Sequence, residues 1–336
     1  MNRLKAHINQ RVPVKELPII KEILNYECQL QVVEFVRLRI DINPYYFKCF
    51  LKLYISEIEL VQEETSDELY ELFVDPQILN SKELDVDVPE IISYNVGGFS
   101  TGGDGDGDGD FKKNTQTILV EETPKLISSN NTTGLRTWEA ALYLANCLHD
   151  PAIVNSLLPS GLDQSKTILE LGCGTGLLGL SLAKSQKIHN FGTKTPSKII
   201  MTDGSMAVFE NSHSMLSLNS IDSSLVQFRQ LVWGEDLALA ENVDVVVGAD
   251  ITYDSRILEP LCKTIDDLFR NHGLQTALIS ATIRNATTIE SWEKELNTWF
   301  EKRWKVPVVE KQPGNIKSAC YFSTNTPEIR IYLITR

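Results

Sequence analysis

The residues best suited to binding a ligand lie in one stretch, Thr167 to Gly179, which reads TILELGCGTGLLG. An apolar run there ends at the acid Glu170, and a helix-like run closes the stretch. Between and within these runs lie four glycines: Gly172, Gly174, Gly176 and Gly179. Glycines allow the backbone angles and the close ligand approach that a tight strand-to-helix turn needs. The first N–H groups of the helix have no partner inside it. The stretch therefore predicts a nucleotide-type cofactor loop.

Two classes of cofactor fit this glycine spacing. Gly174, Gly176 and Gly179 match the dinucleotide pattern G-x-G-x-x-G. The same segment, with Glu170, matches acid-x-G-x-G-x-G, the pattern of S-adenosylmethionine (SAM) methyltransferases. A pyrophosphate needs N–H donors and positive potential at the turn, which a carboxylate at Glu170 opposes. SAM carries a positive sulfonium and a positive ammonium, which a carboxylate favours. We therefore predict SAM, with a dinucleotide or a plain glycine-rich turn as alternatives.

Three further candidate residues lie at or just beyond the ends of apolar runs, and ligands in an open α/β sheet bind beyond the carboxyl ends of strands. Asp203 ends KIIMTD, where an acid can accept hydrogen bonds from both ribose hydroxyls or cap the next helix. Trp233 lies in LVWGED, and its ring can stack on adenine or pack in the core. Asp250 ends DVVVGAD and is spaced D-x-x-Y with Tyr253. We expect this pair to meet the group that accepts the methyl.

Strands and helices alternate from Ile118 onward, which implies an α/β fold with a doubly wound, mostly parallel sheet. The expected strands are Ile118–Glu121, Thr167–Leu171, Lys198–Thr202, Val226–Val232, Asp244–Ala249 and Thr276–Ala281. The expected helices are Trp138–Leu148, Leu177–Lys184, Met206–Leu218, Ile257–Phe269 and Ile289–Trp299. Two last strands, near Ala319–Ser323 and Ile329–Ile334, have so short a connection that we expect an antiparallel pair.

The N-terminal part has helical periodicity up to about residue 90. Asn43-Pro44 suggests an N-cap and first residue of a helix, and Thr65 with Glu68 suggests a capping box for another. The stretch from Gly97 to Asp110, which contains GGDGDGDGD, is expected to be a disordered linker and lacks the patterns of calcium-binding loops. We expect a helical region 1–90, a linker 91–130 with a possible edge strand, and a cofactor-binding domain 131–336.

Composition narrows the class of protein. The chain has 336 residues and a net charge of −13, which argues against a general polyanion binder and suits a basic partner surface. None of the six cysteines forms C-x-x-C or a metal-like spacing with histidine, so we expect reduced thiols, no metal site and a cytoplasmic protein. We expect neither a signal peptide nor a membrane span.

Several segments together resemble a known family. GLRTWEAALYLANCL, ILELGCGTGLLG, Asp203, LVWGED and GADITYD are similar, in this order, to the family-16 lysine methyltransferases of the seven-β-strand class. The resemblance runs from about Gly134 to the C-terminus. The helical N-terminal region resembles one branch, the eukaryotic elongation factor 2 lysine methyltransferases. The Gly-Asp tract is not part of the family pattern.

The resemblance implies a class I, Rossmann-like SAM methyltransferase with a seven-stranded sheet, which transfers methyl from SAM to a lysine of a protein. The family's D-x-x-Y motif falls on Asp250 and Tyr253, which we expect to be catalytic. Its cofactor contacts fall on Trp138, Gly172, Cys173, Gly174 and Ala249. Elongation factor 2 is the expected partner of a monomeric enzyme that binds neither nucleic acid nor membrane.

Three other functions stay open at this point. Methyltransferases of nucleic-acid bases or of glutamine carry a proline-containing tetrad where this chain has Ala249 to Tyr253, without proline. A non-catalytic module could keep SAM as a structural ligand, although Glu170, Asp203 and Asp250 are all intact. A dehydrogenase would require the dinucleotide.

Overall fold

The computed structural model describes residues 1–97, 115–126, 133–158, 166–185, 198–237, 239–309, 312–313 and 320–336. The GGDGDGDGD tract lies outside these residues.

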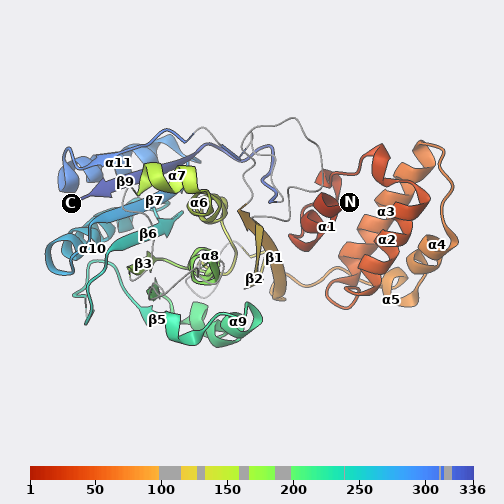
Figure 1. The fold of residues 1–336 in the computed structure, drawn as a ribbon, viewed down its shortest axis with the longest axis horizontal. Coiled ribbons are helices and arrows are strands. Elements are labelled where there is room, and N and C mark those ends of the chain that lie inside the picture. The colour runs from red at the N-terminus through yellow and green to blue at the C-terminus, as the bar shows by residue number, and fades with distance from the viewer. Residues whose placement is uncertain are drawn as a thin grey trace.

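A seven-stranded sheet in the order β5-β4-β3-β6-β7-β9-β8 lies in one half of the molecule, and the N-terminal helices form the other half (Figure 1). The strands of this sheet are β3 (Thr167–Leu171), β4 (Lys198–Asp203), β5 (Val226–Gln230), β6 (Val245–Ala249), β7 (Thr276–Thr282), β8 (Trp304–Lys305) and β9 (Ile329–Thr335). Only β9 runs antiparallel to its neighbours, β7 and β8. This confirms the doubly wound, mostly parallel sheet. The strand order reverses between β3 and β6, which is where open α/β sheets bind ligands.

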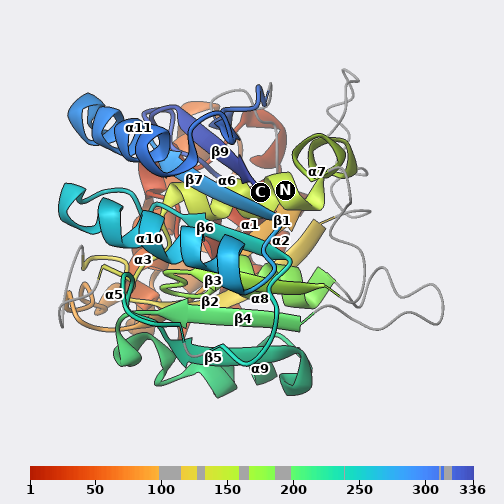
Figure 2. The ribbon, with the colours of Figure 1, turned by 90° about the vertical axis from the view of Figure 1, so that its left-hand side faces the viewer.

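Helices cover both faces of the sheet (Figure 2). One face carries α6 (Glu139–His149), α8 (Leu177–Ser185) and α9 (Ser212–Leu218), and the other carries α10 (Leu258–Asn271) and α11 (Ala286–Phe300). The short helix α7 (Pro151–Leu157) follows α6. Side chains alternate along β3, so that Ile168 joins the core under α6 and α8 while Leu169 joins the core under α10 and α11. Glu170 therefore points to the α8 face.

A separate two-stranded antiparallel sheet consists of β1 (Glu90–Gly97) and β2 (Thr115–Glu122). It lies against α8 and α9. The side chain of Asn219, which follows α9, accepts from Leu119 N at 2.9 Å and donates to Leu119 O at 2.7 Å. The strand expected at Ile118–Glu121 belongs to β2, whereas β1 was not expected. The division into three parts at residues 90 and 130 stays a prediction.

The N-terminal helices are α1 (Asn2–Asn9), α2 (Tyr26–Arg37), α3 (Pro44–Leu60), α4 (Asp67–Phe73) and α5 (Pro76–Leu79), and they enclose their own hydrophobic core. The expected cap of α3 is confirmed, because Asn43 Oδ1 accepts from Tyr46 N at 2.9 Å. The capping box on Thr65 is wrong by one position, since Ser66 Oγ accepts from Leu69 N at 3.3 Å. Within the described residues, no helix has both the length and the apolar character to cross a membrane.

Two expected elements differ in the structure. The helix expected over Met206–Leu218 divides into a 3₁₀ turn, Met206–Phe209, and α9. The backbone leaves helical angles at Asn211 (φ −106°, ψ 11°), whose side chain donates to Glu121 of β2. The expected terminal hairpin is also wrong, because residues 320–323 are not in a strand and β9 instead lies between β7 and β8. The apolar side chains of β9 are buried on both faces, which suits an inner strand better than an edge hairpin.

A nearly buried ion pair joins the N-terminal helices to β1. Arg11 Nε lies 3.1 Å from Glu90 Oε2, with side chains only 8% and 10% exposed. Asn43 Nδ2 donates to the same oxygen at 2.8 Å. Glu90 therefore holds both α1 and the start of α3 against the sheet.

We predict that Glu90→Leu lowers the free energy of unfolding by about 3–5 kcal/mol, because it leaves the Arg11 guanidinium buried without its counter-charge. The double variant Arg11→Met/Glu90→Leu should lose much less, since no charge is left unpaired. Urea unfolding of the three proteins measures both effects. A double variant as unstable as Glu90→Leu would show that the ion pair does not stabilise the contact between the N-terminal helices and β1.

Candidate cofactor and active site

The turn between β3 and α8 has a path that only glycine accommodates easily. Gly172, Gly174 and Gly176 have φ values of +63°, +50° and +78°, in the left-handed region that side chains resist. A Cβ on Gly172 would come within 2.7 Å of Ile251, and one on Gly176 within 2.6 Å of Met201. The glycines are therefore required both by backbone angle and by packing.

This turn borders a cavity of about 600 Å³ at the carboxyl ends of the parallel strands, a size typical of small-molecule sites. It brings together nearly all the residues predicted for the site: Trp138, Glu170, Gly172, Cys173, Gly174, Asp203, Trp233, Ala249, Asp250 and Tyr253. Gly176 is the exception, because it lines a neighbouring cavity instead.

Asp203 fastens the end of β4 to the glycine turn. Its Oδ2 accepts from Gly174 N at 3.1 Å, and its Oδ1 accepts from Ser205 N at 2.9 Å. Burial raises its pKa, and these backbone donors offset part of that rise. Each carboxylate oxygen has room for a further hydrogen bond, so the group can still accept from the hydroxyls of a ribose.

Glu170 lies deep in the site, with only 3% of its surface exposed. Burial raises its pKa to about 8, and Asp203 adds to the rise while Gly179 N–H opposes it. Oε2 has no hydrogen-bond partner. At pH 7 the carboxyl is therefore mostly protonated in the absence of a nearby cation. The expectation that Glu170 presents a standing negative charge needs this correction, because its ionised form depends on a cation entering the cavity.

Two tryptophans line the cavity. Trp138 directly precedes α6, and its Nε1 donates to Thr133 O at 3.0 Å. The guanidinium carbons of Arg136 and Arg284 lie 4.8 Å and 5.1 Å from its ring centroid, in cation–π contact. Trp233 packs against Gly172, and its buried Nε1 has no partner.

Asp250 directly follows β6 and ties three elements together. Its backbone is left-handed, with a φ of +52°. Oδ1 accepts from Thr282 N at 2.8 Å. Oδ2 accepts from Thr282 Oγ1 at 2.9 Å, Arg284 Nη2 at 3.2 Å and Ala140 N at 3.4 Å. The carboxylate thus links β6 to the end of β7 and to the first turn of α6.

Tyr253 lies at the open rim of the cavity, with 55% of its surface exposed. Cys173 is buried, and burial raises the pKa of its thiol well above the usual value. Its thiol is therefore neutral, and its backbone N–H donates to Thr202 O at 2.9 Å.

Sequence reasoning missed the two arginines. Arg136 stands two positions before Trp138 in GLRTWEAA, and Arg284 follows the apolar run of β7. The rule that singled out Asp203 and Asp250, a polar residue just beyond a strand, would also have found Arg284. No comparable signal pointed to Arg136, since it lies on no strand end.

The groups that line the cavity fit SAM. Glu170 Oε2 and Trp233 Nε1 are buried polar atoms without partners, which is costly unless a ligand completes them. The acidic side chains of the cavity can pair with the sulfonium and ammonium of SAM and accept hydrogen bonds from its ribose hydroxyls. Arg136 can pair with the carboxylate of its amino-acid part.

Comparison with known proteins agrees with this geometry. A family model described as lysine methyltransferase matches residues 119–299. Protein-lysine N-methyltransferase EFM3 of Saccharomyces cerevisiae is 31% identical over 338 residues, which cover 96% of this chain and 89% of that protein. Protein-lysine N-methyltransferase EEF2KMT of Homo sapiens is 29% identical over 280 residues, covering 78% of this chain and 72% of that protein. The chain belongs to the lysine methyltransferase family and is a SAM-dependent protein-lysine N-methyltransferase.

Proposed function

We propose that this methyltransferase modifies a lysine of elongation factor 2, in the cytoplasm and as a monomer. The observation that carries the proposal is the extent of the yeast match, which covers 96% of the chain and so reaches well beyond residues 119–299, where the family model ends. The N-terminal helices have their own core and lie outside residues 119–299, which the family model matches. Together with their resemblance to the elongation factor 2 branch, this supports a shared protein substrate.

The reaction is a displacement by the lysine nitrogen. When bound, SAM supplies a methyl group on a positively charged sulfur. The lysine ammonium first gives up one proton to solvent. The nitrogen lone pair then forms the new C–N bond as the C–S bond breaks, which leaves a methylammonium and an uncharged sulfur. A free lysine has a pKa near 10.4, so the enzyme must receive an amine that has lost one proton. Alignment of the reacting atoms is worth roughly 7–11 kcal/mol in such reactions, and we assign most of the rate gain to it.

We assign the cofactor contacts to the groups that line the cavity. Asp203 would bind the ribose hydroxyls, because each of its oxygens keeps a free lone pair beside its backbone donor. Trp233 would stack on adenine. The backbone at Gly172 to Gly174 and at Ala249 would border the amino-acid part and the sulfur.

We assign Asp250 and Tyr253 to the lysine. Asp250 Oδ2 already accepts from Arg284, whose side chain is 39% exposed and also pairs with Glu139. The incoming ammonium would take the place of Arg284 at this oxygen, while Thr282 keeps the carboxylate in position. The exposed ring of Tyr253 would face the cation, an attraction of about 0.5–2 kcal/mol.

The substrate is tested by mass spectrometry of elongation factor 2 from cells with and without this protein. We expect one lysine to lose its methylation when the protein is absent and to regain it when the protein is restored. An unchanged methylation pattern would mean that the substrate is another protein.

Asp250→Asn tests the catalytic assignment better than alanine does, because asparagine tolerates a φ of +52° and alanine does not. We expect turnover to fall about 100-fold or more, as it does when reacting groups are misaligned, with SAM affinity changed less than about threefold. The control is Asp254→Asn, on the same turn, which keeps its contact with Arg256 N. Equal turnover in the two variants would remove Asp250 from the reaction.

A further inference from the structure

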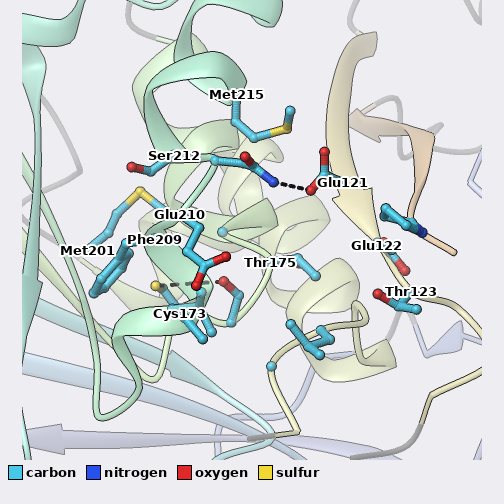
Figure 3. A pocket seen from close by; sticks show the side chains of 18 of the residues that line it. Glu121, Glu122, Thr123, Cys173, Thr175, Met201, Phe209, Glu210, Ser212 and Met215 are labelled. Carbon is cyan, nitrogen blue, oxygen red and sulfur yellow. Dashed lines mark hydrogen bonds between the residues drawn. The ribbon is translucent and has the colours of Figure 1, made fainter. Parts of the chain in front are cut away.

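A second cavity, of about 280 Å³, lies on the other side of the glycine turn. It is bounded by the end of β2, by the turn itself and by the segment that leads into α9 (Figure 3). It shares part of its wall with the cofactor cavity, at Gly134, Cys173, Gly174 and Thr175. A group bound there would therefore lie next to the cofactor cavity, separated from it by the glycine turn. We call it the acidic cavity, for the carboxylates described next.

Four acids line the acidic cavity: Asp87, Glu121, Glu122 and Glu210. None of its described lining residues is a lysine or an arginine. Glu210 lies on one side and Glu121 and Glu122 on the other (Figure 3). Glu121 accepts from Asn211, whereas the side chains of Asp87 and Glu210 form no hydrogen bond or ion pair with any described part of the chain. The described lining thus holds four acids and no basic side chain to neutralise them.

Glu122 gives an independent sign that a donor is missing. It is only 4% exposed, yet its Oε1 has no hydrogen-bond partner. Burial raises its pKa, and contacts with Thr137 and Tyr94 oppose this only in part. Arg136 acts on it from a distance, because its guanidinium lies over Trp138. A buried acceptor left unpaired is costly, and a cation in the acidic cavity would satisfy it.

The rest of the acidic cavity suits the stem of a long basic side chain. Phe209 and Phe228 line it with ring centroids 5.6 Å apart, and Met201 and Met215 complete an apolar wall. Lysine and arginine lay an apolar stem along such a wall and keep the charged head among polar groups. A guanidinium also binds carboxylates through paired hydrogen bonds and stacks on aromatic rings.

We propose that the acidic cavity binds a basic side chain of the protein substrate, preferably an arginine, while the lysine to be methylated lies in the cofactor cavity. The proposal rests on the proposed function in that it takes the substrate to be a protein. Under this proposal, the enzyme selects a lysine by a second positively charged residue that lies near that lysine on the substrate surface.

Binding of a fluorescent peptide tests the acidic cavity directly. The peptide carries one lysine with arginines and glycine spacers on both sides, and it is titrated by anisotropy with the full chain and S-adenosylhomocysteine. The cavity variant is Glu122→Gln/Glu210→Gln. The matched control is Glu290→Gln/Glu301→Gln, which removes the same charge from exposed positions on α11 and just after it. That helix lies at the opposite edge of the sheet from α9 (Figure 2).

We expect the cavity variant to weaken peptide binding about tenfold and the control to weaken it less than about twofold. Glu210→Gln alone, at an exposed position that cannot disturb the core, should weaken it about threefold. Equal losses of peptide affinity in the cavity and control variants would overturn the proposal. They would show that the peptide responds only to the net negative charge of the enzyme.

Methylation of purified elongation factor 2 separates this proposal from the proposed function. The cavity variant should raise KM for that protein about tenfold and leave kcat and SAM affinity unchanged. An unmodified elongation factor 2 with the unaltered enzyme would refute the proposed substrate, and the peptide titration would still decide the acidic cavity. A fall in kcat with an unchanged KM would contradict docking there.

Discussion

The rest of the site depends on the desolvated carboxyl of Glu170. It lies at the end of β3, on the face covered by α8, where burial holds its pKa at about 8 and leaves Oε2 without a partner. The glycine turn passes directly above it, on a path fixed by three positive φ values. β4 and β6 flank β3, so their ends deliver Asp203 and Asp250 to the same cavity. A cationic cofactor would give Glu170 Oε2 the positive partner that it lacks, whereas a pyrophosphate would bring a second acceptor to the same place.

Asp250 is the second residue whose side chain is held firmly by hydrogen bonds. These bonds limit the role that we propose for its carboxylate. A carboxylate that accepts from the end of β7 and from the first turn of α6 cannot swing to act as a mobile base. It can hold a cation, however, and one of its present donors is a half-exposed arginine that the substrate can displace. The same logic appears at the acidic cavity, where acids face a space without a basic partner. Under these proposals, both places offer negative charge to a basic substrate, which agrees with the net charge of −13.

The sequence predicted the sheet well because apolar runs followed by polar residues are local signals. The strand Thr167–Leu171 has the predicted bounds, and the strand-end rule found Asp203 and Asp250. The terminal hairpin failed because a short connection limits pairing only if both segments are strands, and residues 320–323 are not. The charge state of Glu170 could not be foreseen either. Its pKa is set by the packing of α8 and β4 around it, which no spacing of residues reveals.

The most direct measurement is the proton balance of SAM binding. Calorimetric titrations at pH 7, in buffers of different ionisation enthalpy, report how many protons are released. A carboxyl with a pKa near 8 is mostly protonated at this pH, and a cation beside it lowers that pKa. Binding should therefore release most of one proton, and Glu170→Gln should abolish this release. If the release is absent, or is the same in Glu170→Gln, the cofactor site does not work through this carboxyl.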